Sequence, residues 1–381
     1  MDFTKRIVEL KNFMEKNRID LSIIMDISNQ YYVSGYEIRA LTNYERPIVF
    51  IIEKNLTNLI LPGLEENHAK AEAKADHLYV YYEHPEKASE GISYLEHLDK
   101  IISKYPKGTK IGVEINIIFG YLYNHLKMAG FEITDIGNKI AEMRSIKDSQ
   151  EIDLLINAGK LVSLAVSESL KNAKEGISEM EFNDTGNKVI FKEATTKYPN
   201  STLYHSAVCP SGLARAIMPH ISSSTRKFQK GDICIHSRQV GLNGYHAECE
   251  RTFFVGKPLN SKQEHAFNVI VEAQRAAIDF IRPGVAAKDV DLVARKIIQK
   301  AGYGEYAIHR LGHAIGLDNH ETPYLRYDND LILQEGMVFS IEPGIYIPGM
   351  GGFRHSDTVI LTKNDSKLIT EYPRELEKLI F

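Results

Sequence analysis

The sequence predicts two domains, an α/β domain over residues 1–138 and an α+β domain over residues 139–381. Three observations lead to this prediction. The chain has 381 residues, more than a single hydrophobic core usually holds. In its first third, short apolar strand-like runs lie between helical patterns. A long amphipathic helix then begins near residue 145, and charged strand hairpins and further helices follow it.

The first domain is expected to open with a helix over residues 3–17, where Ile7, Leu10 and Phe13 recur at helical spacing. Runs rich in Ile, Val, Leu and Tyr then predict strands. These strands are expected at residues 21–25, 47–52, 58–62, 79–83 and 110–114.

The second domain is expected to open with a helix that Asp148 or Ser149 caps, with Glu151 in its first turn. Ser261 and Glu264 form a capping-box pattern before a further helix that runs toward residue 281. A glycine followed by an acidic helix start occurs in residues 175–182 and again in residues 283–291, which is a faint internal repeat.

Composition excludes several classes of partner. The chain carries 46 Lys and Arg against 50 Asp and Glu, a formal net charge of -4, so neither nucleic acid nor a membrane is expected to bind it. The three cysteines, Cys209, Cys234 and Cys249, show no metal-type spacing and favour a reducing, cytoplasmic location. The N-terminus does not resemble a signal peptide, and no apolar run is long enough to span a bilayer.

The last third places charge inside strand-like apolar segments. Glu342 in VFSIEPGIY is predicted to be buried, which costs several kcal/mol unless the carboxylate is paired or bound to a cation. His313 in GHAIG is the first candidate partner. Glu248 and Glu250 lie two residues apart in a predicted strand, so both side chains are expected on one face.

These blocks have the order and spacing found in the creatinase/prolidase/methionine aminopeptidase superfamily, and the chain resembles that superfamily over nearly its whole length. The matching segments are MRSIKDSQEI, MPHIS, the hairpin GD to RTF, GHAIGL, EGMVFSIEPGIY and FRHSDTV. The resemblance implies a pita-bread catalytic domain over residues 139–381, hydrolase activity and a homodimer. Fold alone does not fix the reaction.

Metal-dependent peptidases of this superfamily hold two divalent ions with two Asp, one His and two Glu. The matching positions here are Ser237, Glu248, His313, Glu342 and Ser356. Neutral hydroxyls cannot offset the charge of two neighbouring ions, so a dinuclear centre is not expected. We expect no metal, and the alternative is one divalent ion, Zn, Mn, Fe or Co, on Glu248, His313 and Glu342.

Other positions resemble creatinase itself. Glu250 and Glu342 match its two substrate-binding glutamates, His220 matches its catalytic histidine, and Arg46 resembles an arginine that reaches the partner subunit's substrate. Glu248 would add negative charge that favours a cationic substrate. We expect His313 or His320 to assist His220 in proton transfer, and Arg46 or Arg326 to bind a substrate carboxylate.

Three functions remain open from the sequence. The first is metal-independent hydrolysis of a C–N bond in a small guanidino, amidine or amino-acid-like substrate. The second is an Xaa-Pro dipeptidase or aminopeptidase with a single divalent metal, because His309, His313 and His320 are spaced as in proline-specific aminopeptidases. The third is a binding protein whose catalytic centre has decayed, as the serines at 237 and 356 would allow.

Overall fold

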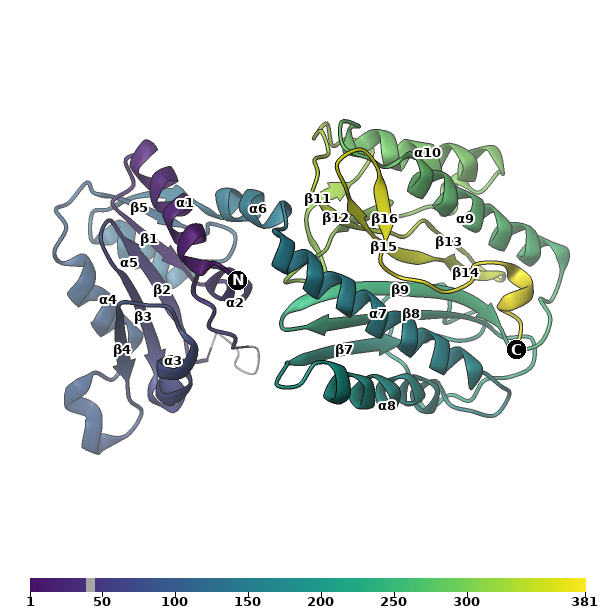
Figure 1. Cartoon of the computed structure of the whole chain (residues 1–381), viewed down its shortest axis with the longest axis horizontal. Coiled ribbons are helices and arrows are strands. Elements are labelled where there is room, and N and C mark those ends of the chain that lie inside the picture. The colour runs from purple at the N-terminus through teal and green to yellow at the C-terminus, as the bar shows by residue number, and fades with distance from the viewer. Residues whose placement is uncertain (39–44) are drawn as a thin grey trace. The chain divides into compact units, whose positions relative to one another are not determined.

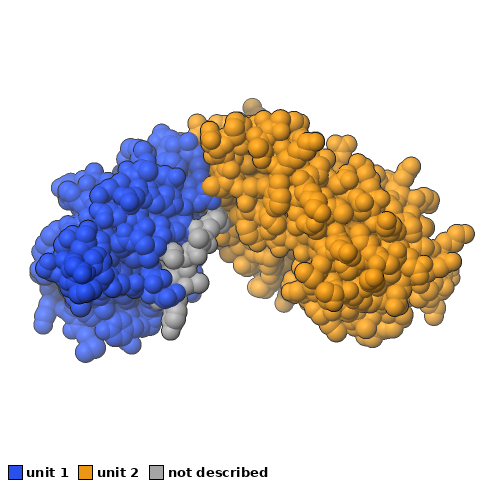
Figure 2. All heavy atoms as spheres, turned by 90° about the horizontal axis from the view of Figure 1, so that it is seen from below, with its two compact units in different colours: residues 1–144 blue, residues 145–381 orange. Residues whose placement is uncertain are grey.

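The computed structural model describes residues 1–38 and 45–381. The chain forms two compact units, residues 1–144 and 145–381, which Figure 2 colours separately. The boundary expected after residue 138 falls inside helix α6 (Gly137–Ser145), whose last residue belongs to the second unit.

Unit 1 contains a six-stranded mixed sheet in the order β4-β3-β2-β1-β5-β6. All five strands that the sequence predicts are present, and β6, which it does not predict, pairs in parallel with β5 at the edge. The α/β class of this unit is therefore confirmed. The elements are α1 (Phe3–Lys16), β1 (Leu21–Ile24), α2 (Ile27–Ser34), β2 (Val49–Glu53), β3 (Thr57–Pro62), α3 (Glu66–Glu72), β4 (His77–Tyr81), α4 (Tyr94–Ile102), β5 (Lys110–Val113), α5 (Gly120–Met128) and β6 (Glu132–Asp135).

Unit 2 is built on an eight-stranded sheet in the order β11-β10-β12-β15-β9-β8-β7, with β16 paired to β15. A separate two-stranded sheet joins β13 and β14. Helices α7 and α8 lie next to β7, β8 and β9, whereas α9 and α10 follow them in the chain as a second pair (Figure 1). The elements are α7 (Ser149–Lys171), α8 (Glu179–Lys197), β7 (Leu203–Val208), β8 (Ile233–Leu242), β9 (Tyr245–Phe254), α9 (Ser261–Phe280), α10 (Ala287–Lys300), β10 (Gly312–Ala314), β11 (Glu321–Leu325), β12 (Val338–Ile341), β13 (Gly344–Ile347), β14 (Gly351–Arg354), β15 (Ser356–Leu361) and β16 (Ser366–Leu368).

The faint sequence repeat corresponds to the same local geometry at two places. Gly176 and Gly284 have φ of 87° and 90°, a left-handed conformation that glycine adopts without a steric penalty. The second helix of each pair, α8 or α10, begins three residues later, at residues 179 and 287. The repeat therefore marks the turn that leads into the second helix of each pair.

The β8–β9 hairpin carries the acidic residues that the sequence singles out. Its turn residues Asn243 and Gly244 have φ of 46° and 84°, as a two-residue hairpin loop requires. The register places Gln239 opposite Glu248 and Ser237 opposite Glu250. Because directly opposite residues share a face of the sheet, these four side chains face the same side.

Helix caps agree with the sequence in one case and differ in another. Asp148 caps α7, and a capping box with Glu151 is complete. For α9 the expected cap, Ser261, is wrong: Asn260 is the N-cap, and its side chain accepts a hydrogen bond from the backbone N–H of Gln263. Ser261 is instead the first residue of the helix.

This difference gives a test by paired alanine substitutions. Asn260→Ala removes the side-chain acceptor for an orphan helix N–H and is expected to cost about 1 kcal/mol of stability. Ser261→Ala removes a side chain that forms no cap bond and is expected to change stability by a few tenths of a kcal/mol at most. Thermal unfolding midpoints of the two variants decide between the caps, and a larger loss for Ser261→Ala would contradict the assignment.

Among the described residues, no helix has the length and apolar character needed to cross a bilayer. Cys209, Cys234 and Cys249 are free thiols and buried.

Candidate active site

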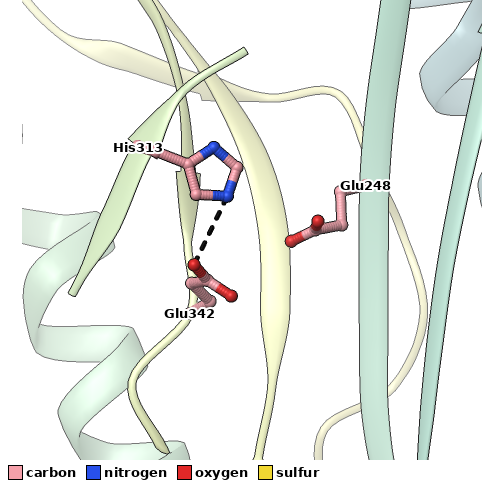
Figure 3. A group of neighbouring side chains, drawn as sticks. All are labelled: Glu248, His313 and Glu342. Carbon is pink, nitrogen blue, oxygen red and sulfur yellow. Dashed lines mark ion pairs between the residues drawn. The ribbon is translucent and has the colours of Figure 1, made fainter. Parts of the chain in front are cut away.

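Three segments distant in sequence bring Glu248, His313 and Glu342 together in unit 2 (Figure 3). Glu248 lies on β9, His313 on β10, and Glu342 directly follows β12. One ligand atom from each residue lies within 4.8 Å of the others. His313 Nε2 is 3.3 Å from a carboxylate oxygen of Glu342. A histidine nitrogen and two carboxylates at this separation form a possible site for one cation.

Glu248 is held in place by neutral donors. The Oγ atoms of Ser340 and Ser356 lie 2.8 and 2.7 Å from its Oε1, and Gln239 donates to its Oε2 at 2.8 Å. The two serine Oγ atoms are also 2.7 Å apart; because each hydroxyl carries one proton, either both donate to Glu248, or one donates to Glu248 and the other donates to that serine. Ser356, which stands where peptidases of the superfamily carry a carboxylate, therefore orients a carboxylate here and adds no negative charge.

The Nε2 of His313 faces the two glutamates and makes no hydrogen bond within the described residues. Its Nδ1 lies 3.1 Å from the backbone oxygen of Ala314, which can only accept, so Nδ1 carries a proton. Its Nε2 is buried, and Glu342 lies within ion-pair distance of it. A histidine fixed through Nδ1 with Nε2 free has the form of a metal ligand.

The electrostatics of the group favour a positive charge. Burial opposes ionisation of His313, but the carboxylates of Glu342 and Glu248 outweigh burial and raise its pKa to about 9. Burial likewise opposes ionisation of Glu342, yet His313, with a contribution from Arg354, lowers its pKa to about 2. Either a proton on His313 or a metal ion bound to its Nε2 would offset the negative charge of Glu248 and Glu342.

Glu250, expected to bind a cationic substrate, is already paired. Arg354 donates from Nε and Nη2 to its two oxygens at 2.5 and 2.7 Å, and both side chains are buried. Burial raises the pKa of Glu250 to about 7, against the attraction of Arg354. Arg354, a residue of the same chain, thus supplies a cation to this carboxylate, which argues against the expected role of Glu250 in binding a cationic substrate.

A hydrogen-bonded chain extends from Arg354 to His309. The tyrosine oxygen of Tyr346 accepts from Arg354 Nη1 at 3.1 Å. His309 Nδ1 donates to the backbone oxygen of Arg310 at 2.6 Å, so its Nε2 accepts from the Tyr346 hydroxyl at 3.0 Å. Burial lowers the pKa of His309 and raises that of Tyr346 to about 12, so both are neutral near pH 7.

Sequence reasoning gave no role to Arg354, Tyr346, Ser340 or Gln239. Arg354 and Tyr346 lie inside the segments FRHSDTV and EGMVFSIEPGIY, which resemble the superfamily, and this was the available signal. These segments do not indicate their partners, because the bond between Arg354 and Glu250 joins residues 104 positions apart.

Of the predicted catalytic histidines outside the group, His320 has a ring contact with it. The rings of His313 and His320 have centroids 4.1 Å apart, and His320 is exposed on its outer side. Burial, and then the charge of His313, lower the pKa of His320. His220 is exposed in the segment between β7 and β8, and the described residues show no bond or ring contact between it and the three grouped side chains.

Arg46 and Arg326 are each engaged by nearby carboxylates. Arg46, in unit 1, lies 3.0 Å from Glu83 and 3.5 Å from Glu45. Arg326, just after β11, forms a two-pronged pair with Asp328. The expected role of Arg46 in a partner subunit's site stays a prediction.

Comparison with known proteins places the chain in a family. Residues 153–363 match metallopeptidase family M24, and residues 6–146 match the creatinase/prolidase N-terminal domain. An Xaa-Pro dipeptidase of Pyrococcus horikoshii is 33% identical over 98% of this chain and 97% of the relative. An Xaa-Pro dipeptidase of Lactobacillus delbrueckii subsp. lactis is 31% identical over 97% and 98%. The crystal structure of a prolidase from Thermococcus sibiricus superposes with a TM-score of 0.87 at 30% identity, covering 100% of this chain and 99% of the other.

The fold and the grouped side chains thus define a hydrolase of the creatinase/prolidase type. The chain belongs to metallopeptidase family M24, and the predicted two-domain pita-bread architecture is confirmed. Its activity class is hydrolysis of C–N bonds. The expectation that the centre works without a metal finds no support, whereas Glu248, His313 and Glu342 agree with the single-ion alternative.

Proposed function

We propose that the protein is an Xaa-Pro dipeptidase that uses one divalent ion held by Glu248, His313 and Glu342. The observation that carries this proposal is the buried Nε2 of His313, which lacks a hydrogen-bond partner in the described residues and faces two carboxylates within 4.8 Å. Relatives named as Xaa-Pro dipeptidases, similar over almost the whole length of the chain, supply the substrate class.

The residues fit one ion and not two. The group supplies one nitrogen and two carboxylate ligands, a set that zinc, manganese, iron and cobalt all accept, and the ion would polarise a substrate carbonyl and activate water. The serines at positions 237 and 356 provide no charge for a second ion.

The surrounding residues have separate tasks. Ser340, Ser356 and Gln239 fix the orientation of the Glu248 carboxylate. His320, in contact with His313 and exposed on its other side, is placed to exchange a proton with the leaving amine or with solvent. Its lowered pKa keeps it neutral near pH 7, so it can accept a proton there.

Metal content and chelation test the proposal. Protein purified without chelator is expected to contain one Zn, Mn, Fe or Co ion per chain and to hydrolyse Xaa-Pro dipeptides. Removal of the ion should abolish this activity, and addition of one equivalent should restore it, because the ligand set is otherwise complete. Creatine, tested beside the dipeptides, serves as the substrate for the metal-independent alternative.

Two results would contradict the proposal. Chelator-resistant turnover of creatine or another guanidino compound would favour metal-independent hydrolysis. Protein that binds no ion and hydrolyses neither class would favour a binding protein on this fold. We further propose a homodimer, which light scattering of the purified chain tests by its mass relative to the 43.1 kDa protomer.

A further inference from the structure

Arg310 stands out among the arginines of unit 2 because, within the described residues, it has neither a carboxylate partner nor an acceptor for its buried Nε. Other arginines of unit 2 are paired with acids: Arg354 with Glu250, Arg295 with Asp291, and Arg326 with Asp328. A buried charged donor left unsatisfied costs more than a neutral one, so this position favours an acceptor that the described chain does not supply.

The side chain of Arg310 is held by an aromatic ring. Its guanidinium carbon lies 4.1 Å from the centroid of Tyr324 on β11. When a guanidinium stacks on a ring face, its N–H groups lie in the guanidinium plane and can still donate to a ligand. The stacking also restricts the side chain, so less conformational entropy is lost when a ligand binds.

Tyr324 places this cation on the same side of the sheet as His313. The two residues are directly opposite in the β10–β11 pairing, as are Gly312 and Leu325. Leu325 belongs to the hydrophobic core, so Tyr324 and His313 point to the other face.

We propose that Arg310 binds the free carboxylate of the dipeptide substrate, which restricts the enzyme to substrates with an uncapped C-terminus. This inference rests on the proposed dipeptidase function. Nε and one Nη of an arginine form a pair of parallel donors that matches the two oxygens of a carboxylate. The carboxylate would satisfy the buried Nε, and the arginines expected for this role, Arg46 and Arg326, already pair with Glu83 and Asp328.

The test compares an Xaa-Pro dipeptide with its C-terminal amide in wild type and in Arg310→Met. The wild type is expected to prefer the free acid in kcat/KM, and Arg310→Met to reduce that preference about 100-fold, mainly through KM. Turnover of the amide should hardly change, because it lacks the charge that Arg310 recognises. Arg310→Lys keeps a point charge without the paired donors and should retain part of the preference.

Arg282→Met is the matched control. Arg282 also rests on an aromatic ring, with its guanidinium carbon 5.6 Å from the centroid of Phe280, but it is exposed on the surface. This variant should keep the wild-type preference for the acid.

The outcomes separate this inference from the function on which it rests. Hydrolysis by the wild type, with an acid-to-amide ratio that neither Arg310 variant changes, would overturn the assignment of Arg310 and leave the dipeptidase function standing. A wild type that neither hydrolyses nor binds the dipeptide would overturn both. Loss of preference in Arg310→Met, or a partial loss in Arg310→Lys if the methionine variant does not fold, supports the assignment.

Discussion

Replacing His313 with glutamine is expected to abolish stoichiometric metal binding and to lower kcat/KM for an Xaa-Pro dipeptide by more than about 100-fold. Changing a residue that only hydrogen-bonds to a metal ligand typically costs up to about 100-fold in activity. Because His313 is proposed to be a ligand itself, its replacement should cost more than this. Glutamine retains an N–H that can reach the backbone oxygen of Ala314, the present acceptor of Nδ1, so local structure should survive. What it lacks is the imidazole lone pair at the position of Nε2.

Thermal unfolding with added metal gives a readout that does not depend on activity. An ion that binds only the folded state stabilises it by about 2.7 kcal/mol at 100 times its dissociation constant. The wild type stripped of metal should therefore unfold at a higher temperature when Zn or Mn is added, and His313→Gln should show little change.

His236→Gln is the control for replacing a buried histidine. His236 is buried on β8 against Phe182, away from the three grouped side chains. It should retain one ion per chain and the metal-dependent shift. Metal binding by His313→Gln equal to that of wild type would show that the ion lies elsewhere, and the proposed ligand set would have to be abandoned.

Strands and helices with strong patterns could be predicted from the sequence, and short polar ones could not. The buried strands of unit 1 are runs of Ile, Val and Leu, whereas β6 has four residues, EITD, with Glu132 exposed and Asp135 only partly buried. Pairing with β5 makes it a strand, and that pairing is a tertiary property. The predicted cap of α9 was wrong for a related reason. Asn260 and Ser261 are both good caps, and the extended backbone of Asn260 decides between them.

The grouping of Glu248, His313 and Glu342 could be predicted because the resemblance to the superfamily places them at its ligand positions, and apolar or glycine neighbours of His313 and Glu342 agree with burial. The pairing of Glu250 could not. Strand alternation places Glu250 on the same face as Glu248, but Arg354 reaches it from β14, a strand that pairs with β13 in a separate sheet. The serines at positions 237 and 356 argue against two ions. They do not determine whether the remaining three ligands hold one, since that depends on distances between β9, β10 and β12.

The buried pair Glu250 and Arg354 is expected to show a large stability effect. Arg354→Met leaves the Glu250 carboxylate buried without its counter-ion and should lower the free energy of unfolding by about 3–5 kcal/mol. Glu250→Gln leaves Arg354 uncompensated in the same way. The double variant carries neither charge, so it should lose much less than the sum of the two single losses.

A double-mutant cycle measured by chemical or thermal unfolding gives the coupling energy directly, and we expect at least about 2 kcal/mol. Lys188 and Asp184, an exposed pair four residues apart on α8, provide the matched cycle, with coupling expected to fall within experimental error. Additive losses at positions 250 and 354 would mean that the two charges do not depend on each other, and Glu250 would again be available for a cationic substrate. Strong coupling assigns Glu250 to the structure and leaves Glu248 and Glu342 as the carboxylates of the chemical site.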